Sequence, residues 1–380
     1  MIVLNAVGDI ALNKRFIEII EKGYGERIFE DVRCCFDKAD INFGNLESTL
    51  STRGKRDGKN QLVWGSPKSV NVLKDVGFNV LSLANNHSFD YGFDGCIDTV
   101  KYLEENNIQC FGVGDNLRSS REALIIKHNC IAVGFLGYSC KTTNGRNSNK
   151  NSYGSPSIEY SYIKKDLREL STKVDIKIVS LHWGYEQYNY PSPQQVKLAH
   201  KIIDAGTDLI IGHHPHVLQG YEIYKDKPIF YSLGNFIFDD VVCQSGGCLK
   251  WNEENKQCII VKMNISSKEV CVSELIPVRL NDELKLELLH DNEKEVLLKK
   301  IDYWSQMGTN KDYGKFWKNF RIEKELKNCN PKIDYGYILK NLYKIRPYHL
   351  IYVLGQLKVS LRPIAKYLLI KFGFNPSQYH

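Results

Sequence analysis

Three histidines lie within four positions directly after an apolar run, in the segment Ile211-Gly212-His213-His214-Pro215-His216. Side chains alternate in an extended chain, so His214 and His216 would point to one side and His213 would face away. Imidazoles are frequent ligands of transition metals. We therefore expect His214 and His216 to bind metal ions.

Four other polar groups also follow apolar runs. Gly8-Asp9 and Asn45-Leu46-Glu47 offer carboxylates, Asn85-Asn86-His87 offers an amide and an imidazole, and His182 ends a further run. Each has a structural reading when taken alone, because Asp and Glu commonly cap helices or accept bonds from backbone amides, and an Asn-His pair can shape a turn. Together they form a mixed carboxylate, amide and imidazole set, which suits Mn²⁺, Fe or Zn²⁺ in a pair of sites.

The chemistry that such a pair favours is hydrolysis. Two ions roughly 3.5 to 4 Å apart can clamp an attacking hydroxide and a phosphoryl oxygen, and they lower the pKa of the water between them. His87 follows the expected ligand Asn86. Its imidazole could protonate a leaving group or stabilise an anion, so we expect it to be catalytic.

The segments that must position these residues alternate short apolar runs with helical stretches from Met1 to about Pro277. This alternation predicts an α/β protein with a large buried sheet, and such sheets bind ligands where the carboxyl ends of their strands meet. The expected strands are Ile2-Val7, Ile41-Phe43, Val80-Leu83, Ile125-Ile126, Ile131-Leu136, Ile176-Leu181, Leu209-Ile211 and Ile229-Ser232. The expected helices are Ser66-Gly77, Phe93-Asn107, Ile158-Lys173 and Pro193-Ala205.

Two segments fall outside this pattern. Cys140-Ser157 is rich in Asn, Ser, Gly and Lys, which predicts a long loop over or beside the site, either a lid or a disordered stretch. Beyond a boundary expected near Pro277, residues 278–380 have the composition of a helical, basic extension. Its part from Lys340 to Phe374 alternates apolar and basic residues, a pattern that could contact an anionic membrane peripherally, although packing on the protein is favoured.

The composition is that of a folded protein. Hydrophobic residues make up 43% of the 380 positions and charged residues 25%, while the net charge of +7 is spread among interleaved acids and bases. We expect no nucleic-acid partner, because the basic residues form no dense patch with stacking aromatics outside the C-terminal tail. The 11 cysteines form no CxxC pair, the N-terminus lacks a signal-peptide pattern, and no apolar run is long enough to span a bilayer. These features predict a cytoplasmic protein that is not an integral membrane protein.

The ordered motifs resemble the CapA family, which is named for poly-γ-glutamate capsule synthesis, over roughly Met1 to Pro277. The motifs are Gly8-Asp9, Asn45-Leu46-Glu47, Asn85-Asn86-His87, His182-Trp183-Gly184-x-Glu186, Gly212-His213-His214-Pro215-His216 and Gly234-Asn235-Phe236. The resemblance implies the four-layer α/β/β/α fold of calcineurin-like metallophosphoesterases, with two divalent metal ions held between paired sheets. The C-terminal hundred or so residues lie outside the resemblance.

The resemblance also implies a role for each matching residue. Asp9 and His216 would bind the first metal, and Glu47 would bridge the two metals. The second metal would be bound by Asn86, His182 and His214. His87 would be catalytic, and Asn235 would lie close to the site. The wider phosphoesterase pattern has Asp-x-His at its first motif, whereas this chain has Asp9-Ile10-Ala11. The first site is therefore expected to be weaker or to be completed by another group.

Three functions are compatible with the sequence. The leading one is a metal-dependent phosphoesterase-like hydrolase acting on a phosphorylated, glycan-linked or peptide substrate, in the service of capsule or surface-polymer biosynthesis. The second is a non-catalytic accessory component of a polyglutamate or polysaccharide capsule complex, which would dock through the basic tail. The third is a metal-dependent epimerase or lyase, in which His87 abstracts a proton.

Overall fold

The structure is a computed structural model that describes residues 1–329 except 55, 57, 59–60 and 309. The chain divides into two compact units, Met1–Thr309 and Asn310–His380. In the second unit the described part is the helix α9 (Tyr313–Cys329). The basic stretch from Lys340 to Phe374 lies outside the described residues, so its expected amphipathic character stays a prediction.

The first unit extends past the boundary that the sequence suggested near Pro277. Strand β17 (Val270–Leu280) runs through that proline and pairs with β16 (Gln257–Ile265) along its length. The helix α8 (Asp291–Gly308) then buries Leu297 and Ile301 in the core of the same unit. The change of composition after Pro277 therefore falls inside one unit, in which two more strand segments precede α8.

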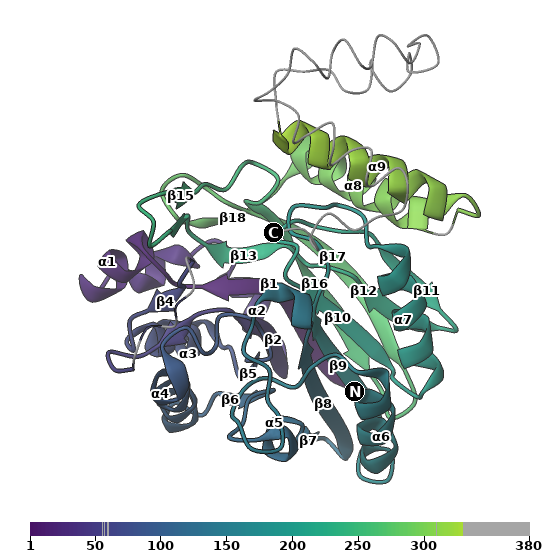
Figure 1. Cartoon of the computed structure of the whole chain (residues 1–380), viewed down its shortest axis with the longest axis horizontal. Coiled ribbons are helices and arrows are strands. Elements are labelled where there is room, and N and C mark those ends of the chain that lie inside the picture. The colour runs from purple at the N-terminus through teal and green to yellow at the C-terminus, as the bar shows by residue number, and fades with distance from the viewer. Residues whose placement is uncertain (55, 57, 59–60, 309, 330–380) are drawn as a thin grey trace, which may run out of the picture. The chain divides into compact units, whose positions relative to one another are not determined.

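Two sheets form the centre of the first unit (Figure 1). The eight-stranded sheet has the order β18-β17-β16-β1-β2-β5-β6, with β13 pairing with β1 in parallel. Its further strands are β1 (Ile2–Ala11), β2 (Ile41–Leu46), β5 (Val80–Ser82), β6 (Gln109–Phe111), β13 (Asn235–Phe238) and β18 (Leu286–Leu288).

The six-stranded sheet has the order β11-β12-β10-β9-β8-β7. Its strands are β7 (Leu124–His128), β8 (Ile131–Ser139), β9 (Ile176–His182), β10 (Leu209–His213), β11 (Tyr221–Tyr224) and β12 (Lys227–Phe230). Strands β8, β9, β10 and β12 are parallel neighbours, so their carboxyl ends meet at one edge of the sheet.

Helices cover the outer face of each sheet and give four layers. The helices α1 (Arg15–Glu21), α2 (Arg33–Phe36), α3 (Ser69–Val76) and α4 (Gly92–Glu105) pack on the eight-stranded sheet. On the six-stranded sheet lie α6 (Tyr160–Leu170) and α7 (Pro193–Asp204), on the opposite side of Figure 1. Apolar residues of both sheets, Phe43 and Phe135 among them, fill the space between them. The expected four-layer α/β/β/α fold is confirmed.

The four helices expected from apolar spacing are present as α3, α4, α6 and α7, and each expected strand lies within or overlaps a strand of the structure. Of the strands in the two sheets, the sequence interpretation missed β6, β11, β13, β16, β17 and β18. In β17 the burial changes repeatedly along the strand, and Val270 and Val278 are buried while Cys271 and Glu274 are exposed. Such a partly covered strand has no continuous apolar run to reveal it.

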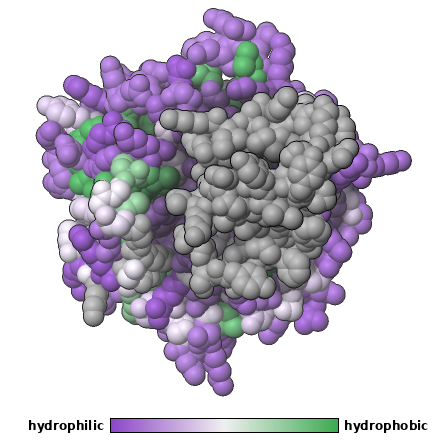
Figure 2. All heavy atoms as spheres, turned by 45° about the horizontal axis from the view of Figure 1, so that its top comes forward, coloured by the Kyte–Doolittle hydropathy of each residue, from purple (hydrophilic) through white to green (hydrophobic). Residues whose placement is uncertain are grey.

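The described residues contain no helix that combines the length and hydropathy needed to cross a bilayer. On the face drawn in Figure 2, most of the coloured residues are hydrophilic, and hydrophobic residues gather in small separate patches. This surface agrees with the interleaved charges of the sequence.

Candidate metal centre

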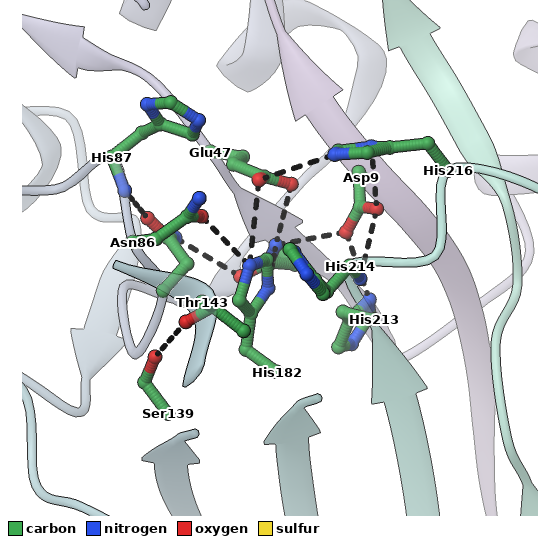
Figure 3. Close-up of polar contacts among 12 residues, drawn as sticks. Asp9, Glu47, Asn86, His87, Ser139, Thr143, His182, His213, His214 and His216 are labelled. Carbon is green, nitrogen blue, oxygen red and sulfur yellow. Dashed lines mark hydrogen bonds and ion pairs between the residues drawn. The ribbon is translucent and has the colours of Figure 1, made fainter. Parts of the chain in front are cut away.

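The seven residues expected to do chemistry come together where the two sheets meet (Figure 3). In the eight-stranded sheet, β1 pairs with β2 so that Asp9 lies beside Asn45, and Glu47 follows the end of β2. In the six-stranded sheet, β9 pairs with β10 so that His182 lies beside His213. Each sheet therefore supplies one half of the cluster.

Asp9 is fully buried at a break in the regular pairing of β1. Its Oδ1 accepts a hydrogen bond from Asn45 Nδ2 at 2.9 Å, and its Oδ2 accepts one from the backbone N–H of His214 at 3.2 Å. The ring atom Nδ1 of His213 lies 3.4 Å from Oδ1, and that of His216 lies 3.4 Å from Oδ2. Burial by itself would raise the pKa of Asp9, but the two imidazoles outweigh it and hold this pKa well below its usual value.

Gly8 allows the backbone to pass close to the next strand at this point. A Cβ atom on residue 8 would lie 1.9 Å from the carbonyl oxygen of Gly234, which accepts a hydrogen bond from the N–H of Asp9 at 2.9 Å. Only glycine fits here without moving β1, so the Gly8-Asp9 pair fixes the position of the carboxylate.

Glu47 is the second fully buried carboxylate of the cluster. Its Oε1 lies 3.4 Å from His182 Nε2 and 3.8 Å from His216 Nε2, so two imidazoles from the other sheet approach the same oxygen. Its Oε2 accepts a hydrogen bond from Asn45 Nδ2 at 3.4 Å. Burial, and then the nearby charge of Asp9, raise the pKa of Glu47 well above its usual value.

The histidine segment after β10 is not extended, which corrects part of the sequence interpretation. His214 has a φ of 94° and His216 a φ of 57°, both in the left-handed region. Their rings nevertheless reach the cluster, because the chain turns between them. His213 does not face away: its ring is 1% exposed, with Nδ1 against Asp9 as described above.

His182 connects the carboxylates to the loop after β5. Its Nε2 lies 2.8 Å from Oδ1 of Asn86, and its ring centre lies 4.7 Å from that of His214. Burial, and then the neighbouring histidines, lower the pKa of His182 well below its usual value, and burial first lowers the pKa of His214 to about 4. Both imidazoles are therefore neutral at pH 7, which is the form that binds metals.

The donor atoms fit a pair of divalent ions. One group, Glu47, His182 and His214, and a second, Asp9, Glu47 and His216, each bring their ligand atoms within 4.8 Å of one another, and the two groups share Glu47. Among the described residues, several buried atoms of the cluster have no hydrogen-bond partner, namely Glu47 Oε1, His214 Nδ1 and both ring nitrogens of His213. Buried polar atoms normally have such a partner, and Glu47 and His214 belong to the donor groups, so a cation would satisfy their two atoms.

His87 lies beside this cluster, and a buried carboxylate contacts its ring. Its Nδ1 lies 2.6 Å from Oδ2 of Asp90, an oxygen that also accepts a hydrogen bond from the backbone N–H of Val63 at 2.8 Å. The backbone N–H of His87 donates to Asn85 Oδ1 at 3.0 Å. The ring orientation is thereby fixed with Nε2 as the remaining nitrogen.

The long segment Cys140-Ser157 lies beside the loop that carries Asn86, as expected. A Cβ atom on Gly145 would come within 2.8 Å of Asn86 Cα, and Ser155 Oγ donates to the carbonyl of Asn85 at 3.5 Å. The segment contains the short helix η2 (Lys141–Thr143) and several bridges, one of them between Gly114 and Gly154. The segment therefore forms an ordered side of the site.

Asn235, which the resemblance places close to the site, contacts one of its histidines. Its Oδ1 lies 2.9 Å from Nδ1 of His216.

Sequence reasoning gave no role to three polar residues of the site. Asn45 donates to both buried carboxylates, Asp90 contacts the ring of His87, and Glu186 brings a carboxylate to His214 and His216. Asn45 and Glu186 stand inside motifs that the sequence already marked. Asp90 follows His87 by three residues, a spacing that one tight turn brings together.

Known proteins are similar to this chain. The family described as "Bacterial capsule synthesis protein PGA_cap" matches residues 3–240, more than half of the chain. "Capsule biosynthesis protein CapA" of Bacillus anthracis is 31% identical, covering 73% of this chain and 67% of that protein. "PGA biosynthesis protein CapA" of Bacillus subtilis is 36% identical, covering 61% of this chain and 62% of that protein.

Among solved structures, a phosphatase from Mycoplasma pneumoniae aligns with a TM-score of 0.47 at 15% identity, covering 73% of this chain and 93% of that one. The chain spans about two thirds or less of the length of the two CapA proteins. The match of the family to residues 3–240 includes every residue that forms the cluster of buried carboxylates and imidazoles. The chain therefore belongs to the bacterial capsule synthesis family PGA_cap.

Proposed function

We propose that the chain is a metal-dependent phosphoesterase-like hydrolase that serves the production of a capsule or surface polymer. The observation that carries the proposal is the sharing of Glu47 between two groups of donor atoms. A shared carboxylate is what brings two cations close enough to act on one substrate. The names of the two CapA relatives support the biological setting, and the substrate within that setting is part of the proposal.

The residues divide between two ions. Asp9, Glu47 and His216 would hold one, while Glu47, Asn86, His182 and His214 would hold the other. Divalent ions held there would act as Lewis acids toward a phosphoryl oxygen and would lower the pKa of water. Mn²⁺, Fe²⁺ and Zn²⁺ all suit this mixture of oxygen and nitrogen donors.

His87 would supply the proton. With Nδ1 directed at the buried carboxylate of Asp90, its Nε2 is the nitrogen that can give a proton to a leaving oxygen. The Asp90 carboxylate would stabilise the charged imidazole and hold the ring in place. Asn45 would keep the two ligand carboxylates at a fixed separation through its amide group.

A second candidate function is a non-catalytic role in a polymer-synthesis complex. The observation that favours it is the names of the two CapA relatives, which refer to biosynthesis and not to hydrolysis. In that case the metal centre would stabilise the fold or form part of a docking surface, and His87 would have no catalytic role.

The test is metal content together with hydrolysis of an aryl phosphate by the full chain loaded with Mn²⁺, Fe²⁺ or Zn²⁺. We expect the wild type to retain metal and to hydrolyse the ester, Asp9→Asn to lose both properties, and His87→Ala to lose hydrolysis while keeping metal. Glu30→Gln, an exposed carboxylate elsewhere, is the control. A wild type that retains no metal contradicts the proposal, and metal retention without any dependence of activity on His87 favours the accessory role.

A further inference from the structure

The donor groups around Glu47 do not include every carboxylate near the cluster. A third group consists of Glu186, His214 and His216, whose ligand atoms also lie within 4.8 Å of one another. Glu186 is exposed, whereas His214 and His216 are each 4% exposed. The carboxylate therefore stands on the solvent side of two buried imidazoles that face the proposed ions.

The loop that carries Glu186 is tied to the loop that carries both histidines. The N–H of Trp183 donates to the carbonyl of His213 at 3.0 Å, and the N–H of Gln187 donates to the carbonyl of Pro215 at 2.7 Å. These bonds lie before and after Glu186 and pair the loop after β9 with the loop after β10. The backbone of residue 186 is thus held close to the histidine loop, within reach of its side chain.

Two left-handed residues shape this loop around Glu186. Gly184 has a φ of 100°, and a Cβ atom there would meet Gln195 Nε2 at 2.7 Å, while Gln187 has a φ of 62°. Non-glycine residues seldom adopt such angles, so the surrounding hydrogen bonds must hold Gln187 in place. Directly after Glu186 the backbone turns back toward the loop that carries His214 and His216.

On the other side of His216 no donor is available at position 11. Ala11 is fully buried in an apolar cluster with Val63, Val241, Phe238 and Trp251. The His216 ring packs against the last two of these, with ring centres 5.2 Å from Phe238 and 5.0 Å from Trp251. A further ligand for an ion at His216 must therefore come from another direction.

We infer that Glu186 is a ligand of the divalent ion held at His216, which it binds from the solvent side. The inference rests on the metal centre of the proposed function and adds a residue to it. The donors to that ion become the carboxylates of Asp9, Glu47 and Glu186 together with one imidazole. Carboxylate-rich sites suit Mn²⁺, whereas sites with more imidazoles suit Zn²⁺. Glu186 therefore shifts the donor set of this ion toward the oxygen-rich sites that accept Mn²⁺.

The test measures Mn²⁺ binding to the full chain by equilibrium dialysis and by the Mn²⁺ electron paramagnetic resonance signal. We expect Glu186→Gln to weaken the binding of one Mn²⁺ by about tenfold or more, since ligand-shell changes typically have effects of about 10- to 100-fold. Glu186→His keeps a donor but replaces oxygen by nitrogen, so it should move the preference of the same ion toward Zn²⁺. Glu30→Gln should bind Mn²⁺ as the wild type does.

The possible failures are distinguishable. Equal numbers and affinities of Mn²⁺ in the wild type and Glu186→Gln would overturn the inference and leave the metal centre of the proposed function in place. A wild type that binds none of Mn²⁺, Fe²⁺ and Zn²⁺ would overturn both. Because Glu186 is exposed, the chelator-treated variant should melt at the same temperature as the chelator-treated wild type, so a loss of binding is not a loss of folding.

Discussion

The contact between His87 and Asp90 predicts how much activity the Asp90→Asn variant retains. His87 Nδ1 lies 2.6 Å from Asp90 Oδ2, and Asp90 is fully buried. Asparagine has the same shape but carries no charge, so the charge-assisted hydrogen bond to the ring is lost. The ring of His87 and the N–H of Val63 both contact Oδ2 of Asp90, so the amide oxygen of asparagine can take that place and the charge is what the variant loses. The imidazolium that forms when His87 is protonated is therefore less stable in the variant.

The expected size of the effect follows from the type of bond. Hydrogen bonds to charged groups contribute about 1.5 to 3 kcal/mol. When this stabilisation is lost from the transition state alone, kcat falls about 10- to 150-fold, since each 1.4 kcal/mol is roughly a factor of ten. His87→Ala removes the proton donor itself and should lower kcat by about 10²- to 10⁴-fold.

The assay is a double-mutant cycle on aryl phosphate hydrolysis with saturating Mn²⁺, with metal content measured for each variant. Asp90→Asn should lower kcat in the wild type but change little in the His87→Ala background, because Asp90 acts through the ring. Asp94→Asn, an exposed carboxylate on α4, is the matched control. An equal loss in both backgrounds would refute the reasoning, as would a wild-type kcat for Asp90→Asn.

Three further predictions concern stability. Chelation should lower the melting temperature by about 3 to 5 °C for each ion lost, because an ion present at 100 times its Kd adds about 2.7 kcal/mol and the unfolding entropy of a chain of this size is roughly 0.65 to 0.8 kcal/mol per degree; an unchanged melting curve would contradict a bound ion. Gly8→Ala must move β1 away from the Gly234 carbonyl, so urea unfolding should show a free energy of unfolding lower by about 1 to 3 kcal/mol, and the variant should lose metal. Gly247→Ala, whose added Cβ would contact no other atom, should change neither the stability nor the metal content. Burial, and then the charge of Asp166, raise the pKa of Tyr138 well above its usual value, so the folded state keeps the hydroxyl protonated while the unfolded chain loses this proton near pH 10. The unfolding free energy should therefore fall by about 1.4 kcal/mol per pH unit above pH 10 in the wild type and not in Tyr138→Phe, and a constant difference between the two from pH 9 to 11 would refute the assignment.

The sequence predicted well that these carboxylates and imidazoles come together, because they follow strands whose carboxyl ends converge, while the binding of metal by them stays a prediction. His182 ends β9 and Glu47 follows β2, and both were expected at strand ends. The apolar runs before them made these strands visible, and the resemblance of the ordered motifs to the CapA family implied the four layers. Local patterns were therefore sufficient wherever a residue's place depends on the strand that carries it.

The features that were missed depend on contacts that local patterns do not contain. His213 lies against Asp9 at the end of β10, and the left-handed angles of His214 and His216 bring the next rings to the same cluster, which a pattern of alternation cannot predict. The role of Asp90 depends on a turn, and that of Glu186 on hydrogen bonds between two loops that are distant in the sequence. The extension of the first unit past Pro277 depends on the pairing of β17 with β16.

The division of the cluster between two sheets has a mechanical consequence. Asp9 and Glu47 belong to one sheet, and His182 and His214 to the other. Each proposed ion would take at least one carboxylate from the first sheet and at least one imidazole from the second, so it would crosslink two layers whose interior contacts are mainly apolar and have little directionality. Removal of the ion should therefore loosen both sheets together at this edge, with amide hydrogen exchange rising in β2 and β9 alike while the opposite edge stays protected.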